Sequence, residues 1–216
     1  MKAFSLLAIL LVLIAGVLSC RETKVSESPR ASQTGSQAPQ YVVELADLID
    51  PRELDELTGK RAATPRLREA CFWLAKGREQ GEELEAMIDD AHGLLGYPQG
   101  HRTREQKRAL LENLELLRAY GCLSNEGMSK LRTSNAPRVE RGEFAEEVLT
   151  VVHVLPRSKV PELDNRLYNL RFLPETLNQR KGAKITEREQ KLAREWHAMG
   201  LLSSEGLAAV VAKTIE

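Results

Sequence analysis

The chain has 216 residues, with 31 basic and 31 acidic side chains and a formal net charge of zero. This balance argues against the concentrated basic surface of a nucleic-acid-binding protein, so we expect no nucleic-acid partner. Aromatic residues make up 5% of the sequence and charged residues 29%, and Leu, Ala, Glu, Lys and Arg are frequent. The composition is typical of a helical protein, and the length suits one domain or two small ones.

The first twenty residues have the pattern of a signal peptide. Lys2 supplies a positive start, residues 6–18 are an apolar run of thirteen, and Ser19 and Cys20 follow. Thirteen residues suit the core of a signal peptide and fall short of the about 20 that a membrane-spanning helix needs. We therefore expect residues 1–19 to be a signal peptide that is removed.

The sequence Val17-Leu18-Ser19-Cys20 resembles the lipobox of bacterial lipoproteins. The resemblance implies a diacylglycerol on the Cys20 thiol, cleavage before Cys20 and acylation of the new amino group, for example with palmitate. Several acyl chains give a stable membrane anchor, because each buried methylene contributes about 0.8 kcal/mol. In Gram-negative lipoproteins an aspartate after the cysteine favours the inner membrane. Arg21 stands there, which implies the outer membrane. The alternatives are an ordinary secretory signal and a free-standing membrane anchor.

Residues 20–40 are expected to be the lipidated cysteine and a flexible linker. After the cysteine this segment has four serines and two prolines and no Leu, Ile, Met or aromatic residue. Such a composition cannot bury enough apolar surface to fold, and as a coil the linker would span about 25 Å. Residues 41–60 are a first helical segment, in which Asp50-Pro51 begins a short helix and Gly59 ends it.

The rest of the chain has the pattern of a tandem duplication with a spacing of 79 residues. The strongest match pairs Gly121-Cys-Leu-Ser-Asn-Glu-Gly127 with Gly200-Leu-Leu-Ser-Ser-Glu-Gly206. Agreement at one spacing indicates one structural element used twice. We therefore predict an all-α fold with two tandem related four-helix units, residues 61–135 and 136–216.

Apolar stripes and capping signals give the predicted helices of each repeat unit. Those of the first are bounded by Thr64-Pro65 and Gly77, by Glu82 and His92, by Thr103 and Gly121, and by the Ser124 cap with Leu131. Those of the second carry Phe144 to Val152, begin at Pro161, begin at Thr186 with Glu189, and begin at Ser203.

The repeated joint Gly-x-Leu-Ser-x-Glu-Gly predicts a helical hairpin, because glycine ends one helix and serine caps the next. A leucine-rich helix followed by Gly-x-Leu, Ser and an acidic residue resembles the short C-terminal hairpins called SHOCT. The resemblance covers about 30 residues per copy and departs from that pattern at Gly127 and Gly206. It implies oligomerisation or anchoring. A well-capped connection is the alternative.

The sequence contains no H-E-x-x-H, C-x-x-C, G-x-S-x-G, P-loop or G-x-G-x-x-G motif, and we expect no catalytic residue, metal or cofactor. Asp89, Asp90, His92 and His101 are the candidates for a metal or acid–base site, with a solvated helix end as the alternative.

The remaining cysteines and the tryptophans are interpreted from their surroundings in the sequence. Cys71 and Cys122 are candidates for a disulfide, because the compartment outside the inner membrane is oxidising. Trp73 and Trp196 align with apolar residues in the other repeat, so we expect both in the core.

Together these features predict a non-catalytic scaffold or adaptor of the cell envelope, anchored to the membrane and binding an envelope protein or itself. The alternative is a periplasmic ligand-binding or cell-wall hydrolytic protein with a cleft between the two helical units.

Overall fold

The computed structural model describes residues 37–212. The chain divides into two units, Met1–Ser36 and Gln37–Glu216, and every described element belongs to the second, called here the folded unit. The predicted signal peptide, the lipidation site Cys20 and most of the predicted linker lie outside the described residues. In the described part of the chain, no helix is long and apolar enough to cross a membrane.

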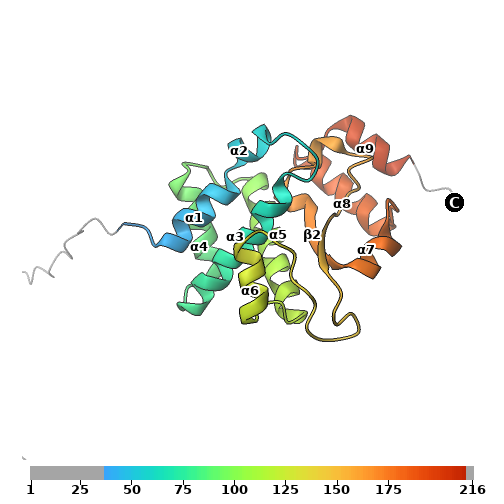
Figure 1. Ribbon diagram of the computed structural model, residues 1–216. Helices are drawn as coiled ribbons and strands as arrows, with labels where there is room; N and C mark the ends of the chain where they lie inside the picture. The colour runs from blue at the N-terminus through green and yellow to red at the C-terminus, as the bar shows by residue number, and fades with distance from the viewer. Residues whose placement is uncertain (1–36, 213–216) are drawn as a thin grey trace, which may run out of the picture. The chain divides into compact units, whose positions relative to one another are not determined.

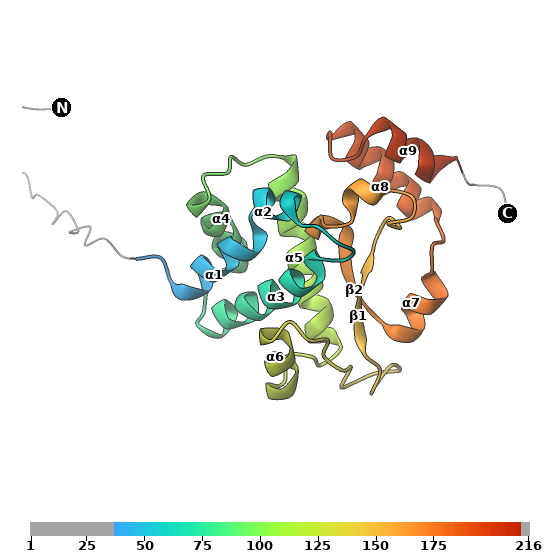
Figure 2. The same cartoon turned by 45° about the horizontal axis from the view of Figure 1, so that its top comes forward.

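The fold is mainly α, with one small antiparallel sheet (Figure 1). In chain order the elements are α1 (Gln40–Ile49), α2 (Pro51–Glu56), α3 (Ala63–Glu79), α4 (Leu84–Leu94), α5 (His101–Ala119), α6 (Asn125–Arg132), β1 (Leu149–His153), the 3₁₀ helices η1 (Pro161–Leu163) and η2 (Leu167–Asn169), β2 (Leu170–Pro174), α7 (Glu175–Lys181), α8 (Glu187–Ala198) and α9 (Ser204–Val211). Figures 1 and 2 show α1, α3 and α4 on one side of α5, and the sheet with α7 and α8 on the other.

The four helices predicted in the first repeat unit are present as α3 to α6, and two of the differences at their ends have a clear physical reason. Gly77 does not end α3, which continues to Glu79. A Cβ at Gly77 would overlap the Met87 sulfur, so this glycine allows α3 and α4 to approach closely. Thr103 does not cap α5 from outside. It lies in the first turn, and its hydroxyl accepts the Gly100 N–H at 2.9 Å.

Helix α1, which the capping signals did not indicate, lies before these four helices in the chain. Its apolar residues Val42, Leu45, Ala46 and Ile49 follow the i, i+3, i+4, i+7 spacing of one helix face, and all four are buried. This face joins the larger hydrophobic core together with α3 and α4. Asp50 then caps α2 as predicted, because its carboxylate accepts the Arg52 N–H at 2.8 Å.

The prediction of a second four-helix unit over residues 136–216 is wrong. Residues 149–153 form β1 rather than a helix, and residues 161–174 form two 3₁₀ helices and β2. Thr150, Val151 and Val152 are β-branched, which favours a strand over a helix. A short apolar run fits either period, and here pairing with β2 decides the outcome.

The two strands pair in the register Val151 with Phe172 and Val152 with Arg171. Residues that alternate along each strand point to opposite faces. One face, which includes Val151 and Phe172, is part of the larger core. The other face carries Val152 and Arg171, and these two residues line a pocket.

The repeated joint has the predicted structure in both copies. Gly121 and Gly200 have positive φ angles of 77° and 73°, which glycine adopts without steric cost. Ser124 caps α6 and Ser203 caps α9, each accepting the N–H of the residue three positions later. The chain therefore contains the same helix–turn–helix connection twice, between α5 and α6 and between α8 and α9.

Candidate functional site

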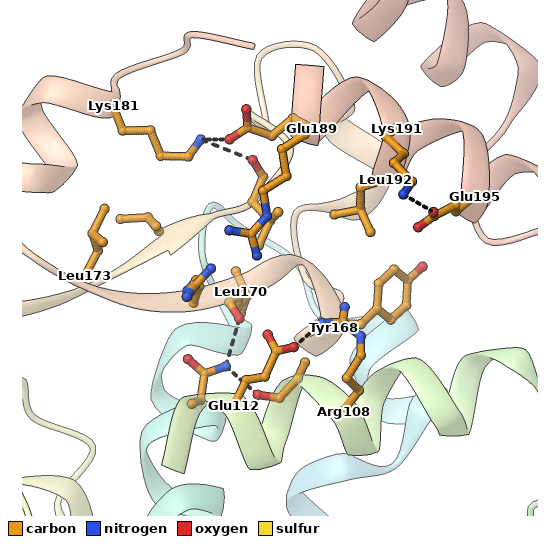
Figure 3. Close-up of a pocket in the computed structure, with 16 residues that line it drawn as sticks. Arg108, Glu112, Tyr168, Leu170, Leu173, Lys181, Glu189, Lys191, Leu192 and Glu195 are labelled. Carbon is orange, nitrogen blue, oxygen red and sulfur yellow. Dashed lines mark hydrogen bonds and ion pairs between the residues drawn. The ribbon is translucent and has the colours of Figure 1, made fainter. Parts of the chain in front are cut away.

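A pocket of about 360 Å³ lies between the outer face of the sheet, α5 and α8. Figure 3 shows Arg108 and Glu112 on α5, Leu170 and Leu173 of β2, and residues of α8 around it. The lining residues are Arg108, Ala109, Glu112, Asn113, Val152, Val154, Tyr168, Leu170, Arg171, Leu173, Lys181, Arg188, Glu189, Lys191, Leu192 and Glu195. Its volume is at the lower end of the range of small-molecule sites.

Helical spacing places four side chains of α8 in the pocket. On α8, Arg188, Lys191, Leu192 and Glu195 follow the i, i+3, i+4, i+7 spacing of one helix face. Trp196 follows Leu192 by four positions, at the border of this face, and is completely buried in the smaller hydrophobic core. Its burial fixes the rotation of α8 and so keeps these four residues at the pocket.

Asn113 on α5 fixes the edge of β2 beside the pocket. Its side-chain amide donates to the Leu170 carbonyl at 2.9 Å, and its side-chain oxygen accepts the Phe172 N–H at 2.8 Å. Asn113 is 1% exposed. This side chain therefore takes the place of a third strand and holds β2 against α5.

Trp196 packs against Tyr168, which lines the pocket. Their rings meet edge to face with centroids 5.1 Å apart. The indole N–H of Trp196 donates to Glu105 at 3.0 Å, and Glu105 in turn accepts from Arg108 at 2.9 Å. The core position predicted for Trp196 is confirmed, whereas Trp73 is only partly buried and packs against the larger core.

All three acidic residues of the pocket are engaged. Glu112 accepts from Arg108 at 2.6 Å, and Glu195 lies 3.9 Å from Lys191. Glu189 caps α8 by accepting the Thr186 N–H at 2.7 Å. Burial raises the pKa of Glu189, but the hydrogen bonds from Thr186 and the charge of Lys181 outweigh it, so this pKa is lowered.

Five basic residues face these three acids, and two of them are not neutralised. Among residues 37–212, no ion pair or side-chain hydrogen bond engages Arg171 or Arg188. The Arg171 Nε is also buried without an acceptor in the described part of the chain. A buried donor without a partner costs about 1–3 kcal/mol. The two arginines, which have no acidic partner in the described residues, leave a positive charge at the pocket, which favours an anion there.

The residues proposed from the sequence for a metal or acid–base site do not line this pocket and do not form another. Asp89 pairs with Lys107 at 2.8 Å, Asp90 is exposed, and His101 is exposed beside Arg104. His92 is fully buried, and its Nε2 lies 3.2 Å from the Gln106 side-chain oxygen. In the described residues no three His, Cys, Asp or Glu side chains gather to hold a metal ion.

The hydrogen bonds around His92 indicate a structural role. The Gln106 amide donates to the Ile49 carbonyl, which leaves its oxygen to accept from His92 Nε2. Burial lowers the pKa of His92, and the Gln106 contact only partly opposes this effect. His92 is therefore a neutral core residue that ties α4 to α5.

The two cysteines that are candidates for a disulfide are free thiols in the structure. Both are buried, Cys71 in α3 and Cys122 in the joint after α5. The Cys122 sulfur lies 3.2 Å from the Arg138 carbonyl oxygen, which it contacts in place of a second sulfur.

In the Cys20→Ala protein we expect no thiol to react in native buffer and two to react after denaturation. Burial raises the pKa of both thiols, that of Cys122 to about 12, so almost no reactive thiolate is present near neutral pH. A disulfide-exchange reagent with and without urea, in the absence of reductant, measures the count. No reactive thiol after denaturation would show that Cys71 and Cys122 are paired.

Sequence reasoning missed Arg171 and Arg188, the two pocket arginines without an acidic partner in the described part of the chain. Arg171 falls in a segment that was expected to be helical, and Arg188 has the pattern of an ordinary surface residue on a helix. The alternation of Leu170-Arg-Phe-Leu-Pro174 is the one local signal of a strand that places Arg171 opposite the core face.

Comparison with known proteins found no matching family model, no similar curated protein and no similar solved structure.

Proposed function

We propose that this protein is a lipid-anchored component of the cell envelope, held at the outer membrane through Cys20 and facing the periplasm. The observation that carries the proposal is the sequence order at the start of the chain. A basic residue, an apolar run and Ser19-Cys20 precede a polar linker. The linker would let the folded unit stand clear of the lipid headgroups.

Within the envelope, the folded unit acts as a non-catalytic adaptor that binds another envelope protein. The engagement of Glu112, Glu189 and Glu195 supports binding rather than proton transfer, because these carboxylates already hold ion pairs or a helix cap. The resemblance of the two joints to SHOCT hairpins suggests a variant of this role. In that variant the protein associates with itself through the joints.

The alternative role is that of a periplasmic ligand-binding protein. The pocket between α5, α8 and the sheet favours it, although this pocket lies inside one folded unit rather than between two helical units. A hydrolytic role has less support, because Asp89, Asp90, His92 and His101 are absent from the pocket lining.

The test is mild crosslinking of the full-length protein in its native membrane, followed by affinity purification, with a Cys20→Ala form as the matched control. We expect the wild-type protein to enter the membrane fraction with a covalent lipid and to recover one partner that the control does not recover. Recovery of the monomer alone, with neither a partner nor a crosslinked second copy, would contradict the adaptor role and its self-associating variant. A Cys20→Ala form that is equally membrane-bound would contradict the lipid anchor.

A further inference from the structure

The pocket contains cationic and apolar surfaces side by side. Arg171 enters from the sheet and Arg188 from α8, so the two unpaired guanidinium groups belong to different walls. The aliphatic lining comes from both strands, the residue after β1, and α8, and includes Val152, Val154, Leu170, Leu173 and Leu192. A ligand that matches both surfaces needs an anionic group and an apolar part.

We propose that this pocket binds a small amphipathic anion, with a carboxylate or phosphate group at Arg171 and Arg188 and an alkyl part against the aliphatic lining. Guanidinium groups suit this head because they donate two parallel hydrogen bonds to the oxygens of a carboxylate or phosphate. The inference goes beyond the proposed adaptor role, because it concerns the folded unit alone and does not depend on the anchor.

The composition of the pocket selects against other ligands. The five basic residues exceed the three acidic ones, and every acidic one already has a partner, so a cation would meet uncompensated repulsion. Among residues 37–212, Tyr168 is the one aromatic residue that lines the pocket, which gives little surface for stacking a nucleobase. A volume of about 360 Å³ suits a short alkyl chain with one head group.

The test is isothermal titration of residues 20–216 with Cys20→Ala, which contain the whole folded unit and carry no lipid. The probes are octanoate and octyl phosphate. Octylammonium and octyl alcohol are the charge controls, and inorganic phosphate is the control for the alkyl part. We expect at least one octyl anion to bind with a dissociation constant below about 1 mM, and all three controls to bind at least about tenfold more weakly.

The variants separate a specific site from general attraction. Arg171→Met and Arg188→Met keep most of the aliphatic stem, and we expect each to weaken binding of the octyl anion by about tenfold or more. Arg194→Met is the matched control, because Arg194 is exposed on the same helix and does not line the pocket. Arg188 is also exposed, so its replacement should leave the fold intact even if that of Arg171 does not. Circular dichroism checks the fold.

Several results would overturn the proposal: no binding of either octyl anion, equal binding of octylammonium or octyl alcohol, or unchanged affinity in Arg188→Met. Equal binding of inorganic phosphate would also overturn it, because the alkyl part would then contribute nothing. These titrations contain neither membrane nor partner, so their failure leaves the anchor and the adaptor role to the crosslinking experiment.

Discussion

Replacing Asn113 with leucine is expected to lower the free energy of unfolding by about 3 kcal/mol or more. The change keeps a similar volume but removes both hydrogen bonds to the edge of β2. The Leu170 carbonyl and the Phe172 N–H would then be buried without partners, at a cost of about 1–3 kcal/mol each. Because the wild-type amide donates to one of these groups and accepts from the other, no apolar residue can replace it.

Urea denaturation followed by circular dichroism measures this change. Asn135→Leu is the matched control, since Asn135 is exposed and its side chain bonds only to the Thr133 hydroxyl. We expect the control to change the free energy of unfolding by no more than about 0.5 kcal/mol. Equal stability of Asn113→Leu and Asn135→Leu would mean that β2 does not depend on α5 for its edge.

The elements that sequence reasoning predicted are those that local chemistry determines. Asp50, Ser124 and Ser203 cap helices in the structure as their positions before apolar stripes indicated. The capping box of Thr186 with Glu189 is also present at the start of α8. A cap involves residues within one helical turn, so its signal survives without knowledge of the tertiary fold.

The elements that sequence reasoning missed depend on contacts between residues far apart in the chain. The pairing of β1 with β2 joins Leu149 to Pro174, and the edge of β2 is completed by Asn113 from a helix more than fifty residues earlier. Neither partner is visible in the local pattern around the other. The 79-residue spacing encouraged the error, because the repeated joint and the helix before it are real, whereas the first two helices predicted in the second copy are not.

The pocket was missed for the same reason. Arg171 and Arg188 are 17 positions apart in the chain and meet the same cavity only because β2 turns through α7 into α8. A search for metal and catalytic motifs passes over arginines, whose importance here comes from the absence of acidic partners in the described residues. Charge compensation is a tertiary property, and composition gave only an overall balance of zero.

Replacing Gly127 with alanine is expected to lower the free energy of unfolding by about 3 kcal/mol. The new Cβ would overlap the carbonyl oxygen of Cys122 and lie 2.6 Å from its carbonyl carbon. Both atoms belong to the backbone of the joint, which the Gly121 turn and the Ser124 cap already hold. Relief therefore requires α6 to move away from the end of α5, which would break the cap.

Gly206, at the same place in the second joint, is the most informative comparison. There an added Cβ would meet the tip of Leu202 at 2.5 Å and the Glu162 carboxylate at 2.8 Å, which are side-chain atoms that can move. We expect Gly206→Ala to cost about 1 kcal/mol, and Gly93→Ala, in an open position of α4, to be neutral or stabilising by up to about 1 kcal/mol. Urea denaturation of the three variants measures the order. Equal losses at Gly127 and Gly206 would show that the shared motif, rather than the backbone contact at Cys122, sets the requirement for glycine.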